Sequence, residues 1–366
     1  VGVVMPQDLG NNVVRPDAMA RVASEKAEEL SRHRLLPGDI VFSRRGDVTR
    51  RSLIRDADDD LLCGTGCLRV RLDPKKADPI FVSYAMAMQE SRDWLIRHAV
   101  GATMPNLNTG ILSELPVRSP RLQVQYAVGA ILGALDDKIA ANRRTANAAG
   151  DLQRALWLSV SEDRRSVSLT TVASPRLGGT PARTDASAWS GPIKWASVRD
   201  LSAADCGILL RTAEAISVEA SQSARRLHEL PVGTVVLTAR GTVGHVTVLG
   251  APAVINQSAY AFVPEDGQSA ALRLGIESLA SSLRKRAHGS VFSTITMDTL
   301  TESMIPDFFS EAGARDVQEL DNLERLRTGV MKENLHLAST RDELLPLLMS
   351  GKITVKDAEK TVEEVV

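Results

Sequence analysis

Two long segments of the chain repeat apolar residues in steps of three and four, the spacing of a helix that packs along one face. The first begins near Gln123, after Pro116 and Pro120, and the second begins near Ala312. Each covers roughly 35 residues, or about 50 Å of α-helix. The predicted buried positions of the first segment are Val128, Leu132, Leu135, Ile139, Asn142, Ala146 and Ala149. Those of the second are Leu323, Leu326, Val330, Leu337, Leu344 and Leu347, with Glu333 and Thr340 at polar positions.

The stretches before these helices contain short strand-like runs bounded by Gly and Pro, such as Asp39–Ser43 and Thr234–Thr238. The residues around the two runs match in order after about 190 residues. The matched pairs include Gly38 with Gly233, Arg45 with Arg240, Gly46 with Gly241, Val48 with Val243, Asp8 with Asp200, and Asn142 with Asn334. The offset changes by only a few residues over most of the chain, so the sequence predicts a duplication.

The duplication predicts an α+β protein in which two β-rich domains alternate with two long helices. The expected parts are a first domain (1–119), a first helix (120–160), a second domain (161–311), a second helix (312–351) and a charged tail (352–366). Because each helix has an apolar face that needs a partner, we expect an antiparallel coiled coil with an internal pseudo-twofold. Asn142 and Asn334 would then face each other near the midpoints and set the register; the alternative is that both are solvated.

The second copy opens with a segment, Leu169–Pro181, that has no counterpart in the first copy. Judged against the repeat, we expect the first domain to be incomplete at its N-terminus. The C-terminal tail after Gly351 or a segment upstream of Val1 would then occupy the empty place.

Composition and charge exclude several classes of function. Lys and Arg (44) nearly balance Asp and Glu (45), so no overall field indicates a nucleic-acid or membrane partner, although a local basic surface is compatible. There is no run of about 18 apolar residues and no signal peptide. Three cysteines, Cys63, Cys67 and Cys206, are too few for a disulfide framework. We expect a cytoplasmic protein without a membrane partner.

The sequence contains no recognisable catalytic or metal-binding set. It has no nucleophile elbow, phosphate-binding loop, dinucleotide fingerprint or adenine-methyltransferase signature. The spacing of Cys63 and Cys67 could suggest a metal site, but their counterparts in the second copy, Ile255 and Ala259, are apolar. We therefore expect both to be small core residues of one strand, and we expect neither a metal site nor an active site.

The best candidate binding residues are basic clusters at matched turns. Residues 32–55 contain seven Arg against two Asp, and Arg44-Arg45-Gly46 follows a predicted strand. Such turns bring the backbone close to a partner, and Arg pairs with phosphate or, bidentately, with guanine. The candidate contacts to duplex DNA are Arg44, Arg45, Arg50, Arg51, Arg240, Thr242, Arg284, Lys285 and Arg286, with Gly46, Gly241 and Gly244 as turn residues. A solvated charged turn is the alternative, and recurrence at matched positions favours DNA. Aromatic residues (4%) are too few for a single-strand stacking surface.

In this order, the motifs resemble the specificity subunit of type I restriction-modification systems. The stretches that carry the likeness are Gly178–Pro181, Ile193–Trp195, Leu230–Gly244, Gly101–Leu107, Leu135–Ile139 and Leu348–Ile353. They correspond to the family's domain opening, its strand–turn motif, the approach to its helix, the helix itself and the C-terminal ending. The chain departs from the family where the first domain lacks its opening and where the Pro-rich approach to the second helix, from Pro306, is weaker.

The resemblance implies a non-catalytic DNA-recognition subunit. Each β-rich domain would be a target recognition domain that reads one half of a bipartite, asymmetric duplex site, and the helices would set the separation of the halves. Two methyltransferase subunits, which hold S-adenosylmethionine and methylate adenine N6, would dock on the chain, and a restriction subunit could join them. The chain itself would hold no cofactor.

Three other interpretations are open at this point. The chain could be a coiled-coil interaction scaffold without a DNA role, an enzyme of unrecognised chemistry, or a degenerate copy that reads only one half-site. A methyltransferase partner together with salt-sensitive duplex binding would favour the DNA-recognition subunit over these three interpretations.

Overall fold

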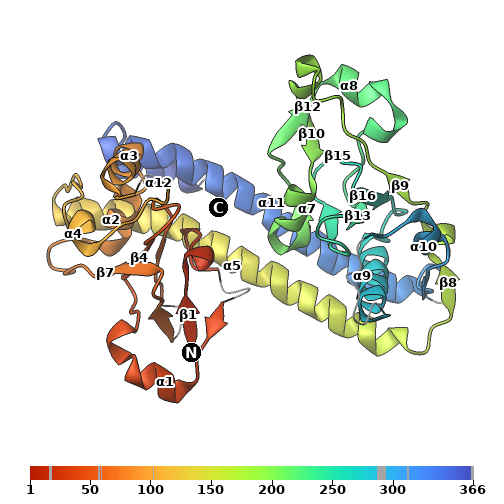
Figure 1. The fold of residues 1–366 in the computed structure, drawn as a ribbon, viewed down its shortest axis with the longest axis horizontal. Coiled ribbons are helices and arrows are strands. Elements are labelled where there is room, and N and C mark those ends of the chain that lie inside the picture. The colour runs from red at the N-terminus through yellow and green to blue at the C-terminus, as the bar shows by residue number, and fades with distance from the viewer. Residues whose placement is uncertain are drawn as a thin grey trace. The chain divides into compact units, whose positions relative to one another are not determined.

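The computed structural model describes residues 1–15, 19–56, 58, 60–101, 103–286, 294–310 and 313–363, without the side chains of Asn11, Lys285 and Arg286. The chain divides into two compact units: Val1–Asp137 with Leu337–Val366 (unit 1), and Lys138–His336 (unit 2). Both long helices cross this division, so each unit contains one β-rich part and a segment of each helix (Figure 1). Within the described part of the chain, no helix is long and apolar enough to span a membrane.

Unit 1 contains two small sheets. Its strands are β1 (Gly2–Val4), β2 (Asn11–Asn12), β3 (Ala20–Arg21), β4 (Ile40–Ser43), β5 (Arg51–Leu53), β6 (Leu61–Cys63) and β7 (Cys67–Val70). In the first sheet, of order β3-β1-β6, β1 is antiparallel to β3 and parallel to β6. In the second, of order β2-β5-β4-β7, β4 is antiparallel to both neighbours and β2 is parallel to β5.

Unit 2 contains three sheets. Its strands are β8 (Ser166–Ser168), β9 (Arg176–Leu177), β10 (Ile193–Ala196), β11 (Ile208–Leu209), β12 (Glu214–Ile216), β13 (Val235–Thr238), β14 (Val246–Leu249), β15 (Val254–Ile255), β16 (Ala259–Phe262) and β17 (Met304–Pro306). The sheet orders are β12-β10-β15, β11-β14-β13-β16-β9 and β17-β8.

The two units repeat one strand plan, which confirms the α+β class and the internal repeat. Central β10, with antiparallel β12 and parallel β15, corresponds to β1 with β3 and β6. Central β13, antiparallel to β14 and β16, corresponds to β4 between β5 and β7. Every residue of β4 and of β13 is buried, because both faces of these strands are covered. Strands β8, β9 and β17 have no counterpart among the described residues of unit 1.

The two long helices are α5 (Leu122–Ser161) and α11 (Ala314–Ser350). In unit 2, Asn142 contacts Asn334 while Gln153 contacts Leu320, so the helix segments run antiparallel. In unit 1, Asp136 on α5 pairs with Arg341 on α11. Every predicted seam position of α5, from Val128 to Ala149, is buried.

The predicted seam of α11 is wrong in its first half. Leu326 is 45% exposed, and Leu323 and Val330 are only half-buried. The buried positions of this stretch are Leu320, Asp321, Glu324, Arg327, Met331 and Asn334. Because three of them are charged, a hydrophobic pattern does not detect them and selects the neighbouring leucines instead. Further along, Leu337 and Leu344 are buried as predicted, while Leu347 is half-buried beside buried Leu348.

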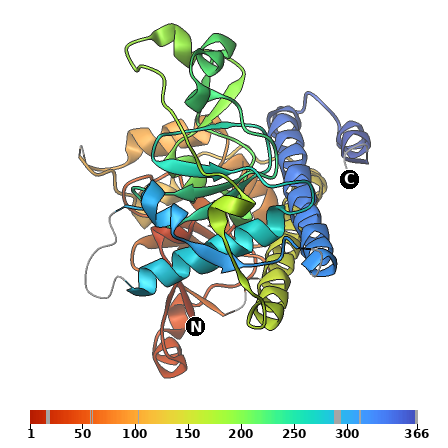
Figure 2. The same ribbon diagram turned by 90° about the vertical axis from the view of Figure 1, so that its right-hand side faces the viewer.

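Shorter helices cover the sheets. Those of unit 1 are α1 (Ser24–Glu29), α2 (Pro79–Ala85), α3 (Gln89–His98) and α4 (Thr109–Ser113); those of unit 2 are α6 (Leu169–Val172), α7 (Val198–Ser202), α8 (Val218–Ser223), α9 (Ser269–Arg286) and α10 (Met297–Thr301). Single 3-10 turns occupy Pro6–Asp8, Ser31–His33, Ala186–Trp189, Asp205–Gly207 and Arg225–Leu227. Helix α9 lies beside the long helices (Figure 2), where Leu274 packs with Trp157 and Leu320.

The C-terminal segment of unit 1 contains a helix that the sequence prediction did not include, α12 (Val355–Glu363). Thr354 and Asp357 cap each other's backbone N–H groups at its start, an arrangement that a Thr-x-x-Asp spacing favours. Ala358 is fully buried, so this helix packs on the unit and is more than a solvated charged tail. At the preceding helix end, Gly351 has φ +72° and terminates α11 as a left-handed cap.

Candidate nucleic-acid interface

The turn after β4 carries the first cluster of candidate DNA contacts. Gly46 has φ +75°, a backbone conformation that favours glycine. The Arg44 N–H donates to the Gly66 carbonyl at 2.9 Å, and the Gly46 N–H donates to the Pro105 carbonyl at 3.1 Å. The turn is therefore fixed by backbone hydrogen bonds on both sides, with the Arg45 side chain exposed at its tip.

The turn after β13 has the same construction in unit 2. Gly241 and Gly244 have φ +78° and +80°, so both predicted turn glycines lie in the left-handed region. The Arg240 N–H donates to the Ser258 carbonyl at 3.2 Å, and the Gly244 N–H donates to the Thr238 carbonyl at 2.9 Å. Arg240 and Thr242 are exposed on this turn, at the position that Arg45 occupies in unit 1.

The other candidate arginines differ in how much of the side chain is free. Arg44 is half-buried, and its Nε is buried with no hydrogen-bond partner among the described residues. Arg50 is half-buried and donates from Nη2 to the Leu9 carbonyl at 2.5 Å. Arg284 donates to the Gly244 carbonyl at 3.2 Å, so it braces the turn after β13 from α9. The side chains of Lys285 and Arg286 lie outside the described residues.

Arg51 is a correction to the predicted set. Its side chain is buried, with only 5% of the residue exposed, and Nε donates to the Ser83 carbonyl at 2.7 Å. Burial lowers the pKa of Arg51 to about 10, while nearby Tyr84 and Asp136 oppose that shift. A side chain in this position supports the interior of unit 1 and has no surface to offer DNA. The Arg-rich stretch of the sequence gave no sign of this, because the burial of Arg51 follows from its place in β5, all of whose residues are buried, whereas Arg50, just before the strand, is half-buried.

Asn142 and Asn334 face each other between the helix segments of unit 2. Asn142 Nδ2 donates to Asn334 Oδ1 at 2.9 Å, and Asn334 Nδ2 donates to the Ile139 carbonyl at 3.2 Å. Both residues are buried, which excludes the alternative of two solvated side chains. That this pair sets the helix register remains our proposal.

Replacing Asn142 with Ala should lower the free energy of unfolding of unit 2 by about 1–3 kcal/mol, because Asn334 keeps a buried polar group without its partner. Urea denaturation is the measurement. The double variant Asn142→Leu/Asn334→Leu, which removes both polar groups, should recover much of the loss. A double variant as unstable as the single one would contradict the pairing argument.

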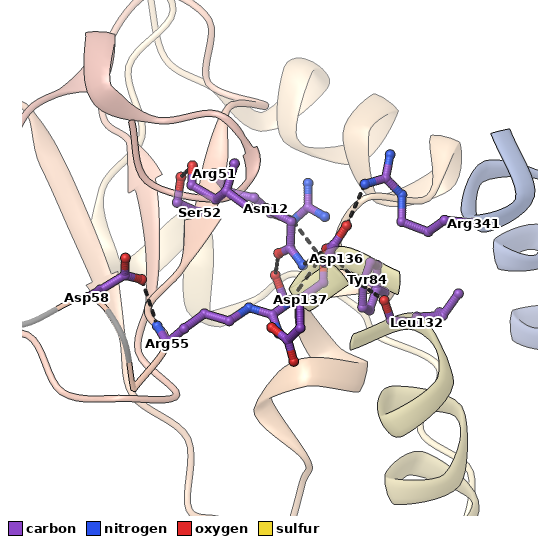
Figure 3. A network of polar contacts seen from close by, with 12 residues as sticks. Asn12, Arg51, Ser52, Arg55, Asp58, Tyr84, Leu132, Asp136, Asp137 and Arg341 are labelled. Atoms are coloured by element: carbon purple, nitrogen blue, oxygen red, sulfur yellow. Dashed lines mark hydrogen bonds and ion pairs between the residues drawn. The ribbon is translucent and has the colours of Figure 1, made fainter. Parts of the chain in front are cut away.

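A buried carboxylate, Asp136 of α5, joins the β-rich part of unit 1 to both long helices (Figure 3). It accepts hydrogen bonds from Tyr84 Oη at 2.5 Å, from Arg341 Nη1 at 2.5 Å and from Asn12 Nδ2 at 3.2 Å. Arg55 Nη2 lies 3.5 Å from its Oδ2 and completes the cluster. Burial and the adjacent Asp136 charge raise the pKa of Tyr84, so its hydroxyl stays a donor.

Glu324 of α11 has the corresponding place in unit 2. Its Oε2 accepts from Arg327 Nη1 at 2.7 Å and from Gln153 Nε2 at 3.0 Å, and Arg273 Nη2 lies 3.2 Å away. Gln153 belongs to α5 and Arg273 to α9, so the carboxylate ties the β-rich part to both helices. Burial raises the pKa of Glu324, but the charges of Arg273 and Arg327 lower it by more than burial raises it. The pKa of Glu324 therefore lies below its ordinary value.

The Asp136 and Glu324 clusters have the same arrangement but are built from different residues. In each unit, a single buried carboxylate is shared between an arginine of the β-rich part and an arginine of α11. Sequence analysis missed both, because an isolated Asp or Glu on a helix gives no periodic signal. The one available hint was that Asp136 lies four residues after Leu132, a seam position, and so falls on the buried face of α5.

Cys63 and Cys67 do not form a metal site in the described residues. Cys63 ends β6 and Cys67 begins β7, so the expectation that they share one strand is wrong; the Gly64–Gly66 turn separates them. Burial raises the pKa of Cys63 to about 11 and that of Cys67 to about 12, which keeps both thiols protonated at neutral pH. In the described ranges, no group of three His, Cys, Asp or Glu side chains could hold a metal ion.

Part of this chain, with the first Arg-Gly turn and much of α5, matches the model of a known protein family. Residues 11–149 match the family model described as "Type I restriction modification DNA specificity domain". This match confirms, for residues 11–149, the resemblance to type I specificity subunits that was seen in the sequence.

One curated protein and two solved structures are similar to this chain. A stretch of 132 residues is 27% identical to the type I restriction enzyme MjaIX specificity subunit of Methanocaldococcus jannaschii, covering 35% of this chain and 30% of that protein. The matched stretch therefore spans about a third of the curated relative's length. The fold is similar to that of the type I S subunit from M. genitalium, with a TM-score of 0.55 and 15% identity over 86% of this chain and 83% of that one. The HsdS subunit of Thermoanaerobacter tengcongensis superposes with a TM-score of 0.35 and 18% identity, over 96% of this chain and 90% of that one.

Proposed function

We propose that this chain is the non-catalytic DNA-recognition subunit of a type I restriction-modification complex. Each unit contributes one target recognition domain, and each domain reads one half of a bipartite duplex site. The domain boundaries that we propose are those expected from the sequence, with 1–119 and 161–311 as the two readers.

One observation carries this proposal: the same exposed Arg-Gly turn recurs at matched positions of both units. Arg45 and Arg240 each follow a fully buried central strand and precede a glycine with positive φ. Exposed guanidinium groups on a rigid turn suit phosphate contacts and bidentate contacts to guanine in the major groove. Two diverged copies suit an asymmetric site, since identical readers would favour an inverted repeat.

The partners follow from the same family membership. Two methyltransferase subunits holding S-adenosylmethionine would dock on this chain and methylate adenine N6 within the two half-sites. A restriction subunit would join that assembly where the host encodes an active one. The paired helices would then convert protein geometry into a defined spacing between the half-sites.

Methylome mapping of the host with and without the gene for this chain tests the proposal directly. We expect loss of N6-methyladenine at one bipartite motif, whose two halves and spacer are read from the map. Binding of the purified complex to that duplex should weaken steeply with salt, as phosphate contacts require. An unchanged methylome, with a complex that binds protein but no duplex, would favour a scaffold without a DNA role. A map with one half-site alone would indicate a degenerate copy.

Replacing Arg240 with Ala should cost about 1–3 kcal/mol of binding and relax discrimination at one base position, because a bidentate contact to guanine is lost. Competition binding with duplexes that carry each single base change in turn measures both effects. Arg315→Ala is the control, since this arginine of α11 has a 90% exposed side chain and lies on a different element. Unchanged affinity and discrimination in the Arg240 variant would contradict the assignment.

A further inference from the structure

The loop that follows α3 is joined to the Arg-Gly turn of unit 1. Val100 and Asn106 exchange backbone hydrogen bonds of 3.0 and 2.9 Å, which closes the loop between them. The Gly46 N–H donates to the Pro105 carbonyl, and the Leu107 N–H donates to the Arg44 carbonyl at 2.9 Å. The turn and the described residues of the loop therefore form one hydrogen-bonded element, which we call the turn–loop element (Arg44–Gly46 with Val100, Gly101 and Thr103–Leu107).

The conformation of this loop is specific. Gly101 has φ +110°, and a Cβ placed there would lie 2.7 Å from the Met104 carbonyl oxygen. Glycine allows so close an approach, and the two Val100–Asn106 hydrogen bonds hold the ends of this loop together. A side chain on such a loop loses less conformational freedom on binding than one on a loose loop.

The exposed surface of the turn–loop element combines apolar and cationic groups. Met104 is 60% exposed, and Val100 is exposed as well. The Arg45 backbone bridges to Asn106 of the same element, and the exposed Arg45 side chain has no ion-pair partner among the described residues. Arg44 Nε and Asn106 Oδ1 are both buried without a hydrogen-bond partner in the same element.

We propose that Met104 is an apolar wedge that enters between two base pairs of the half-site bound by unit 1. This inference rests on the proposed function and adds a second mode of recognition to it. Proteins that unstack a base step use Met, Leu, Ile, Phe or Pro for this purpose, next to basic side chains that hold the flanking phosphates. Arg45 would hold the phosphates, and Met104 would read how easily one base step opens.

Duplex DNA is the occupant that the chemistry favours. An interface with another protein would have a mostly apolar centre that is depleted in charge. Here the exposed Met104 belongs to the same hydrogen-bonded element as Arg45, an exposed arginine on a turn whose counterpart in unit 2 also displays an exposed arginine. Such a mixture of cationic and apolar groups suits duplex DNA, in which a charged phosphate backbone flanks stacked bases.

The test uses the full complex of this chain with its methyltransferase subunits, and a duplex that carries the mapped site. 2-Aminopurine replaces one base at a time in the unit 1 half-site, leaving out the methylated adenine, because a methyltransferase can itself extrude that base. We expect fluorescence to rise on binding at one step. Met104→Ala should abolish this rise and weaken binding by about tenfold, the loss expected for an apolar contact of this size. Met104→Leu should retain both effects, and the polar Met104→Gln should lose them.

Met304→Ala is the matched control, because Met304 is 53% exposed on β17 of unit 2 and should change neither readout. Specific binding by the complex without any fluorescence rise, or with a rise that Met104→Ala leaves intact, would overturn the wedge and leave the proposed function standing. Failure of Met104→Ala to assemble with the methyltransferase, with its fold intact by circular dichroism, would show that a protein covers this residue and would also overturn it. Absence of specific duplex binding by the unsubstituted complex would instead overturn the proposed function.

Discussion

Replacing Glu324 with Gln should lower the stability of unit 2 by about 3–5 kcal/mol, the loss expected when one partner of a buried ion cluster is removed. The substitution keeps the size of the side chain but removes its charge. Arg327 and Arg273, whose side chains are only 6% and 3% exposed, then lose the carboxylate that compensates their burial. Arg273 retains Glu277 at 2.6 Å, so we expect the helix-borne Arg327 to be the group whose charge is left without compensation.

The contribution of Glu324 depends on pH with a defined sign. Its folded pKa lies below the ordinary value, because the two arginines outweigh the effect of burial. Such a group stabilises the fold fully above its unfolded pKa, about 4.3. This stabilisation is lost as the pH falls through the folded pKa. The stability difference between the wild type and Glu324→Gln should therefore be largest at neutral pH and shrink below about pH 4.

Hydrogen exchange read by mass spectrometry is the best measurement, because a protein of two units need not unfold in one step. Amides within Lys138–His336 should exchange faster in Glu324→Gln, and those of unit 1 should keep their rates. The control is Glu319→Gln on the same helix, whose side chain is 53% exposed and pairs with Arg315 at 3.6 Å. If Glu319→Gln and Glu324→Gln change the exchange rates of unit 2 equally, the loss of stability does not depend on the burial of the carboxylate.

Replacing Asp136 with Asn should destabilise unit 1 by a similar amount, about 3–5 kcal/mol. Asp136 is the shared acceptor for Tyr84, Arg341 and Asn12, and Arg341 and Arg55 have side chains only 10% and 17% exposed. Asn presents one oxygen where the carboxylate presents two, and it carries no charge to compensate these arginines. We expect faster exchange in Val1–Asp137 and Leu337–Val366, with unit 2 unaffected.

The adjacent residue offers a matched control for this prediction. Asp137 pairs with Arg55 Nη1 at 2.5 Å, but its side chain is 63% exposed. An exposed pair contributes about 0–1 kcal/mol, so Asp137→Asn should leave the exchange rates nearly unchanged. Equal effects of the two substitutions would mean that Arg55, and not the buried network, accounts for the loss.

Much of the candidate interface could be predicted from the sequence because it is local. A strand of buried residues followed by Arg and Gly has few conformations available, and Gly46, Gly241 and Gly244 all adopt the positive φ that such a turn requires. The exposure of Arg45 and Arg240 follows from their place just after the strand. Arg51 could not be placed in this way, because the pairing of β5 with β4 decides which side of the sheet it faces.

The sequence by itself determined the duplication, the α+β class, both long helices and the seam of α5. These depend on periodicity and on matched positions, and both are properties of residue order. Only the tertiary structure decided the seam of α11, the burial of Asp136 and Glu324, and the union of the Arg45 turn with the Met104 loop. Each of these joins residues that are distant in the chain, and a buried charge needs compensating partners that here come largely from other elements.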